Sequence, residues 1–131
     1  MKNLFLLILL TFSIAAYSGN DRETESVISW LEIVDSGKYA ASWDESAPFF
    51  QEQISSPKWV QALNKARAPL GRVISRKVTN TSAHSTLPGV PNGEYVIVTL
   101  DTNYEHKKTA TETVTVSKDG SEWRVIGYFI K

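Results

Sequence analysis

A single glutamate, Glu112, lies in a segment rich in Thr and Val that carries no other charge, residues 109–116 (TATETVTV). Its alternation predicts a strand in which Glu112 shares a face with Val114 and Val116. A carboxylate is costly to bury in an apolar row, so we expect it to be paired with a cation or to have a raised pKa. The first outcome indicates a structural role, whereas the second is typical of a general base.

Arg76 is the expected partner of Glu112. Alternation along the strand expected at residues 72–84 places Arg76 on one face with Arg72, Ile74 and Val78. In this interpretation, Arg76 and Glu112 form a buried ion pair that holds the fold together. A second structural interpretation is that Glu112 reaches solvent at the rim of the sheet.

Two alternatives give these residues a functional role. In the first, Glu112 is the general base of an isomerase- or lyase-like reaction, and Tyr104 or Tyr39 donates a hydrogen bond to the substrate. In the second, the chain binds a small ligand without chemistry, and Arg76 or Arg67 holds its anionic group at the mouth of a pocket. The sequence alone leaves both alternatives open.

Other kinds of site lack the residues they need. The chain contains no Cys, and His84 and His106 are its only histidines, without metal-ligand spacing around them. There is no nucleophile elbow, and the glycines of residues 87–93 (LPGVPNG) lead into a strand rather than a helix. We therefore expect neither a metal nor a cofactor.

The first 18 residues predict a secretory signal peptide. Lys2 precedes an apolar run from Leu4 to Ala16, and small residues, Ala16 and Ser18, precede a cleavage point before Gly19. The run is shorter than the roughly 20 residues of a membrane-spanning helix, so we expect no stable membrane insertion after cleavage. Residues 19–131 then form a single domain outside the cytoplasm, which without disulfides depends on its core.

The charge of the chain is balanced overall but uneven along its length. Its formal net charge is zero at pH 7, which argues against a general nucleic-acid binder. Acids dominate residues 19–52, whereas residues 53–93 contain no acid. This pattern fits either surface contacts between the two segments or an anion-binding patch. The bases of the second segment are Lys58, Lys65, Arg67, Arg72, Arg76 and Lys77.

The elements expected from the sequence are helices first and strands afterwards. Helical spacing predicts one helix over residues 21–36, a short one holding Tyr39 and Trp43, and a third that starts at Ser56-Pro57 and stops before Pro69. Strands are expected at residues 72–84, 94–104, 109–117 and 121–130. This order predicts an α+β fold, with about three helices packed on a curved four-stranded antiparallel meander.

Two hairpins predict the register of this sheet. A turn around His106 sets Val114 opposite Val98 and Glu112 opposite Leu100. A turn at Asp119-Gly120, flanked by Lys118 and Ser121, sets Val116 opposite Trp123, Val114 opposite Val125 and Glu112 opposite Gly127. Because Gly127 has no side chain, this register predicts a small pocket beside Glu112. The expected core face comprises Val96, Val98, Leu100, Val114, Val116, Trp123, Val125 and Phe129.

The opposite sheet face is amphipathic and is the expected partner surface. It carries Tyr95, Ile97, Ile126, Tyr128 and Ile130, interrupted by Thr113, Thr115 and Arg124. Such a face suits a homodimer or another protein partner, although a helix or the N-terminal arm could cover it. The leading hypothesis is therefore a non-catalytic binding or protein-interaction domain.

The order of several motifs resembles a family of bacterial exported proteins, domain of unknown function 4019. These motifs are SWLEIVDSGKYAASW, SPKWVQAL, RAPLGRVISR, LPGVPNGEYVIV, ETVTV and WRVIGYFIK, which together span about residues 26–131. The resemblance implies a small periplasmic or secreted bacterial domain, with no activity to carry over. The layout also looks like the nuclear-transport-factor-two-like or cystatin-like rolls. The motif residues of interest are Arg67, Arg76, Glu94, Tyr95, Glu112 and Tyr128.

Overall fold

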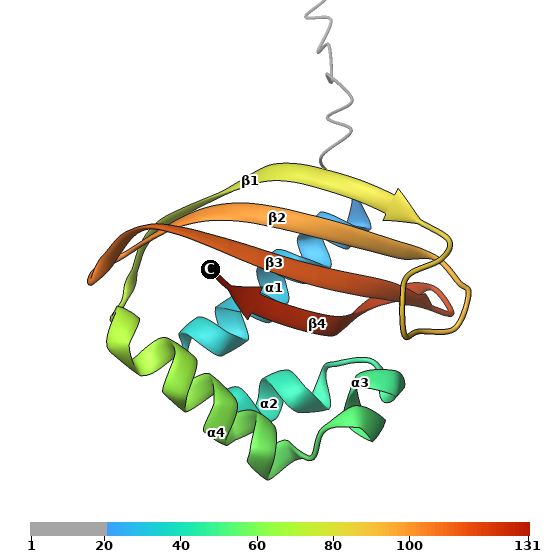
Figure 1. The fold of residues 1–131 in the computed structure, drawn as a ribbon, viewed down its shortest axis with the longest axis horizontal. Helices are drawn as coiled ribbons and strands as arrows, with labels where there is room; N and C mark the ends of the chain where they lie inside the picture. Colours follow the sequence, from blue (N-terminus) through green and yellow to red (C-terminus); the bar gives the residue numbers. More distant parts are fainter. Residues whose placement is uncertain (1–20) are drawn as a thin grey trace, which may run out of the picture.

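The computed structural model describes residues 21–131, so the predicted signal peptide at residues 1–18 lies outside the described residues. Four α-helices precede an antiparallel sheet with the strand order β1-β2-β3-β4 (Figure 1). This arrangement confirms the predicted α+β fold. The elements are α1 (Arg22–Asp35), α2 (Tyr39–Asp44), α3 (Pro48–Gln53), α4 (Ser56–Arg67), a 3₁₀ turn η1 (Ala68–Leu70), β1 (Val73–His84), β2 (Tyr95–Tyr104), β3 (Lys107–Asp119) and β4 (Glu122–Ile130).

The helices begin and end close to where their sequence signals lie. Gly37, with φ of +76°, follows α1, as expected for a residue that leaves a helix. Helix α4 starts at Ser56, as predicted, and its N-cap is Ser55, whose hydroxyl accepts the backbone N–H of Lys58. Phe50 lies in a short helix, α3, in addition to the three helices that the sequence predicts. Within the described residues, no helix has the length and apolar character needed to cross a membrane.

The helices form one layer against the inner face of the curved sheet. In Figure 1, α1 crosses behind the strands, while α2, α3 and α4 lie beyond β4. Two buried indoles join these helices, because Trp30 donates to the backbone oxygen of Ser42 (2.9 Å) and Trp59 donates to the Ser42 hydroxyl (3.0 Å). The core combines these rings with aliphatic side chains of α1, α4 and the sheet, Val27, Leu31, Val34, Leu63, Val96, Val98, Leu100, Val114, Val116 and Val125.

The register between β2 and β3 is as predicted, and the register between β3 and β4 is not. Leu100 lies opposite Glu112, but Glu112 lies opposite Ile130 instead of Gly127. One cause is the turn, whose two central residues are Gly120 and Ser121 instead of Asp119 and Gly120. Gly120 has positive φ and Ser121 does not, which fits a turn with glycine at its first central position. The last pair before it is then Asp119 with Glu122.

A β-bulge at Ile126 is the second cause. Thr115 pairs with Gly127 whereas Val116 pairs with Val125, which leaves Ile126 as the extra residue. After the bulge, the two faces of β4 exchange their residues. The predicted placement of Phe129 in the core is therefore wrong, because Phe129 is 59% exposed.

Other residues of the two predicted sheet faces also lie elsewhere than predicted. A register shift between Val73 and Ser75 turns Ile74 outward, where it is 57% exposed, so Ile74 does not share the inner face with Arg76. The prediction that Tyr128 and Ile130 lie on the partner surface is wrong, because Tyr128 points to the inner face and Ile130 lies opposite Glu112. Tyr95 is buried beneath the loop before β2, with its hydroxyl bonded to the backbone oxygen of Pro91.

We expect Gly127→Ala to leave the free energy of unfolding unchanged or to raise it by about 0.5 kcal/mol, because alanine has less freedom in the unfolded chain. A Cβ at Gly127 meets no atom within 4 Å, and the backbone does not have positive φ. Gly71→Ala is the contrasting variant, because φ there is +73° and a Cβ would lie 2.7 Å from Glu105. Urea denaturation of both variants measures the difference. A loss at Gly127 comparable to that at Gly71 would contradict the open space found around the Cβ position of Gly127.

Candidate functional site

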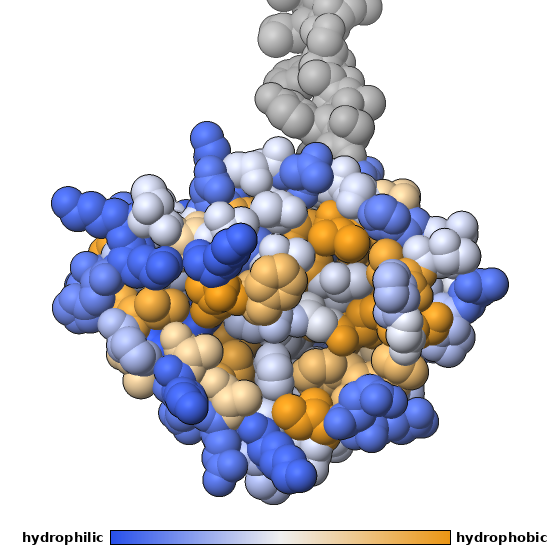
Figure 2. Space-filling view, viewed as in Figure 1, coloured by the Kyte–Doolittle hydropathy of each residue, from blue (hydrophilic) through white to orange (hydrophobic). Residues whose placement is uncertain are grey.

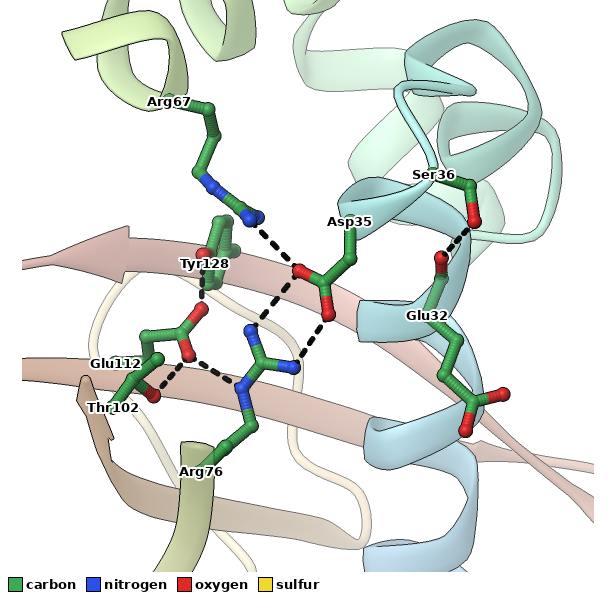
Figure 3. Close-up of polar contacts among 8 residues, drawn as sticks. All are labelled: Glu32, Asp35, Ser36, Arg67, Arg76, Thr102, Glu112 and Tyr128. Carbon is green, nitrogen blue, oxygen red and sulfur yellow. Dashed lines mark hydrogen bonds and ion pairs between the residues drawn. The ribbon is translucent and has the colours of Figure 1, made fainter. Parts of the chain in front are cut away.

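Glu112 is fully buried and both of its carboxylate oxygens accept hydrogen bonds. Its side chain is 0% exposed. Arg76 donates from Nε to Oε1 at 2.7 Å, and the hydroxyl of Thr102 donates to the same oxygen. The hydroxyl of Tyr128 donates to Oε2 (Figure 3). The predicted pairing of Glu112 with Arg76 is therefore present in the structure.

Asp35 extends this pair into a chain of four charges. Arg76 holds Asp35 with both terminal nitrogens, at 2.7 Å and 3.1 Å, in a fork-like geometry that suits a carboxylate. Arg67 donates to the same carboxylate at 2.8 Å. Two cations and two anions thus alternate in the order Arg67, Asp35, Arg76, Glu112 (Figure 3), which we call the charge chain.

Secondary structure brings these four side chains together. Arg76 lies opposite Thr102 in the β1–β2 ladder, and Leu100, two residues before Thr102 on β2, lies opposite Glu112. Asp35 is the last residue of α1, where the negative end of the helix dipole disfavours a carboxylate. Arg67, the last residue of α4, supplies one of the two cations that offset this effect.

The electrostatics of Glu112 are those of a stable anion. Burial alone would raise the pKa of Glu112, but the hydrogen bonds from Arg76, Thr102 and Tyr128 and the charge of Arg76 hold that pKa below its usual range. Burial likewise acts to raise the pKa of Asp35, and Arg76 and Arg67 hold it below its usual range. The carboxylates are therefore ionised near neutral pH.

Buried polar atoms without a partner lie at the other end of the charge chain. The guanidinium carbon of Arg67 lies 5.1 Å from the centre of the Tyr104 ring. Among residues 21–131, neither Nε nor Nη1 of Arg67, nor the Tyr104 hydroxyl, has a hydrogen-bond partner. Burial, followed by the nearby charge of Glu112, raises the pKa of Tyr104 to about 12, so its hydroxyl is protonated.

This geometry does not support Glu112 as a general base. A base needs an unoccupied lone pair within reach of the substrate and a pKa near the working pH, whereas Glu112 is enclosed, bonded at both oxygens and has a lowered pKa. Tyr104 is buried, and Tyr39 lines a surface groove with Asp35 and Arg67 that Glu112 does not line. In the described part of the chain, no group of three or more His, Cys, Asp or Glu could hold a metal ion.

Three of the four predicted binding residues, Glu112, Arg76 and Arg67, lie in one network of hydrogen bonds and ion pairs, whereas Gly127 does not. The network also contains Asp35, Thr102 and Tyr128, which were not predicted as binding residues. Thr102 was detectable, because alternation along residues 94–104 places it on the face of Leu100. Asp35 carries no such signal, because its role depends on how the end of α1 meets β1 and α4.

A separate apolar groove lies between α4 and the last part of β4, with a volume of about 380 Å³. We call it the α4–β4 groove. Figure 2 shows hydrophobic side chains at the surface between these elements, with hydrophilic ones around them. The groove is lined by Trp59, Ala62, Leu63, Ala66, Leu70, Lys107, Tyr128, Phe129, Ile130 and Lys131.

Comparison with known proteins places the chain in a family but does not assign it an activity. A family model described as "Protein of unknown function (DUF4019)" matches residues 26–128. The match covers most of the chain, which therefore belongs to this family and confirms the resemblance seen in its motifs. The search of curated proteins gives no match.

Proposed function

We propose that this member of the DUF4019 family is a bacterial periplasmic or secreted domain that binds a partner without catalysing a reaction. The observation that carries the proposal is the state of Glu112, the one carboxylate that the sequence sets in an apolar row. Its enclosure and its hydrogen bonds favour an architectural role over catalysis. The signal-peptide pattern of residues 1–18 supports the location outside the cytoplasm.

The surface that supports partner binding is the end of β4 and the outer sheet face beside it. Phe129 is 59% exposed, and the half-buried Ile97 and Ile126 lie on the outer face. Exposed aromatic and aliphatic side chains are typical of interaction surfaces. We therefore place the homodimer or partner contact here, with Phe129 in place of the inward-pointing Tyr128.

Photo-crosslinking tests this proposal. A photoreactive phenylalanine analogue at position 129, in the full chain expressed in a bacterium that encodes it, is expected to give a discrete crosslinked product. The same analogue at the exposed Glu32 of α1 is the control and is expected to give none. Equal products at both positions, or no product at position 129, would contradict the proposed interaction surface. Cell fractionation of the same strain tests the location.

A second candidate, binding of a small anion, is favoured by the unpaired nitrogens of Arg67. The adjoining groove is lined by Asp35, Tyr39, Arg67 and Arg72, among others. Arg76 is less suited to this role, because each of its three nitrogens already donates to Asp35 or Glu112. If this candidate is correct, phosphate or acetate raises Tm of the wild type but not of Arg72→Gln, at constant ionic strength.

A further inference from the structure

We propose that the α4–β4 groove binds an extended peptide segment of another protein, which adds to the sheet as a fifth strand beside β4. Apolar side chains of this segment face α4, and carboxylates lie at one of its ends. The inference rests on the proposed binding function and names the class of partner. It is carried by the backbone of β4, by the side chains of the groove and by its charge.

The last part of β4 presents unpaired backbone groups to the groove. β4 is an edge strand, with only β3 beside it in the sheet. Lys131 and Thr111 exchange both of their backbone hydrogen bonds, at 2.9 Å and 3.0 Å. Antiparallel pairing alternates, so the N–H and C=O groups of Tyr128 and Ile130 point away from β3. No hydrogen bond from elsewhere in residues 21–131 reaches these groups.

The two halves of this edge differ in how they are protected. The first half is covered by the segment before α3, because the N–H of Ala47 bonds to the backbone oxygen of Val125 at 2.8 Å. The second half, residues 127–130 (GYFI), carries no charge and includes the exposed Phe129. Natural sheet edges are usually covered, charged or interrupted by proline. An open apolar edge of this kind favours a strand-adding partner.

The opposite wall of the groove leaves room for apolar side chains. Ala62 and Ala66 are exposed, and with Trp59, Leu63 and Leu70 they form the α4 side. In strand addition, the backbone bonds supply affinity while alternate side chains enter pockets. The small side chains of the two alanines therefore leave space for the added fifth strand.

The charge of the groove selects acidic partners. Lys107 and Lys131 line it at the end where β3 begins and β4 stops. None of the ion pairs within the described residues involves either lysine. Carboxylates at one end of a peptide would meet both cations, and such an attraction weakens with salt.

The position of α4 argues against a second copy as the occupant. In Figure 1, α4 runs along the side of β4 away from β3, and both elements line the same groove. Edge-to-edge pairing of two whole sheets would require α4 to move aside. A single extended segment fits between them without that change.

The test uses a random peptide library displayed on phage, selected on the mature chain and counter-selected on Ala62→Trp. Gln61→Trp is the matched control, because position 61 is exposed and lies on the opposite side of α4. We expect enriched peptides with alternating apolar residues and acids at one end. Synthetic copies should lose affinity by roughly tenfold or more for Ala62→Trp and for Lys107→Glu/Lys131→Glu, but not for Gln61→Trp.

Hydrogen exchange of the complex should show protection of the Tyr128 and Ile130 amides. The inference would be overturned if the selection enriched no peptide that binds the wild type more tightly than Ala62→Trp. A concentration-dependent dimer abolished by Ala62→Trp would also overturn it, in favour of a second copy. If the crosslink at position 129 persists in Ala62→Trp, the groove is wrong and the proposed function stands. If position 129 gives no product in the wild type, the proposed function itself fails.

Discussion

Glu112→Gln is expected to lower the free energy of unfolding by about 3 kcal/mol, because it removes one member of a buried ion pair. All three groups that bond to Glu112, on Arg76, Thr102 and Tyr128, are hydrogen-bond donors. The amide keeps one acceptor oxygen, which can serve Arg76 and Thr102, but its NH2 group then faces Tyr128, whose hydroxyl must turn from donor to acceptor. The amide also carries no charge, so Arg76 loses its buried anionic partner. For a domain of this size, the loss corresponds to a Tm lower by roughly 10–20 °C.

The matched control for this substitution is Glu122→Gln. Glu122 also pairs with an arginine, Arg124, at 2.6 Å, but its side chain is 63% exposed. Exposed ion pairs contribute little, so the control is expected to change the unfolding free energy by less than about 0.5 kcal/mol. Urea denaturation of both variants measures the contrast. Equal stability of Glu112→Gln and wild type would show that the carboxylate is retained for a purpose other than the fold.

Local sequence signals predicted the helices, the strands and one register. Helical spacing and caps locate α1 and α4 to within one residue, because these signals act within a few residues of the chain. The β2–β3 register follows from matching the apolar residues of two strands across a short turn. Pairing of Arg76 with Glu112 could be predicted for the same reason, since alternation alone places both on the inner face.

The remaining errors arise from single residues whose effects extend along the chain. Ile126 has no sequence feature that marks it as a bulge, yet it reverses the faces of β4 and moves Tyr128 from the predicted partner surface to Glu112. Asp35 is a further case. Its contacts join α1, α4 and β1, and such contacts between distant segments leave no periodic pattern in the sequence.

The charge chain stabilises the fold, whereas the α4–β4 groove is the proposed interaction site. The charge chain joins α1, α4, β1 and β3 through side chains that are largely withdrawn from solvent. It therefore fixes how the helices sit on the sheet, and α4 in particular. Since α4 forms one wall of the groove, loss of the charge chain is expected to weaken peptide binding indirectly. Binding variants must therefore be compared at temperatures where each variant is folded.

Arg76→Met is expected to lower the unfolding free energy by about 3–5 kcal/mol at neutral pH, because it leaves Glu112 buried without its cation. Methionine keeps the apolar stem, so the change acts mainly on charge. The double variant Arg76→Met/Glu112→Gln should recover part of this loss, since it no longer buries an unpaired anion. Full additivity of the two single losses would contradict a direct interaction between the side chains.

The pH dependence of Arg76→Met should be opposite in sign to that of the wild type. In the wild type the pKa of Glu112 is below its usual 4.5, so its stabilising effect is present above that pH and is lost as pH falls through the lowered value. Without Arg76, burial dominates and raises the pKa above 4.5, so stability declines as pH rises through the raised value. The unfolding free energies of the wild type and of Arg76→Met, measured from about pH 4 to pH 8, should therefore differ most at high pH and become more similar in acid. A gap that is constant over this range would show that Arg76 acts through packing and not through the charge of Glu112.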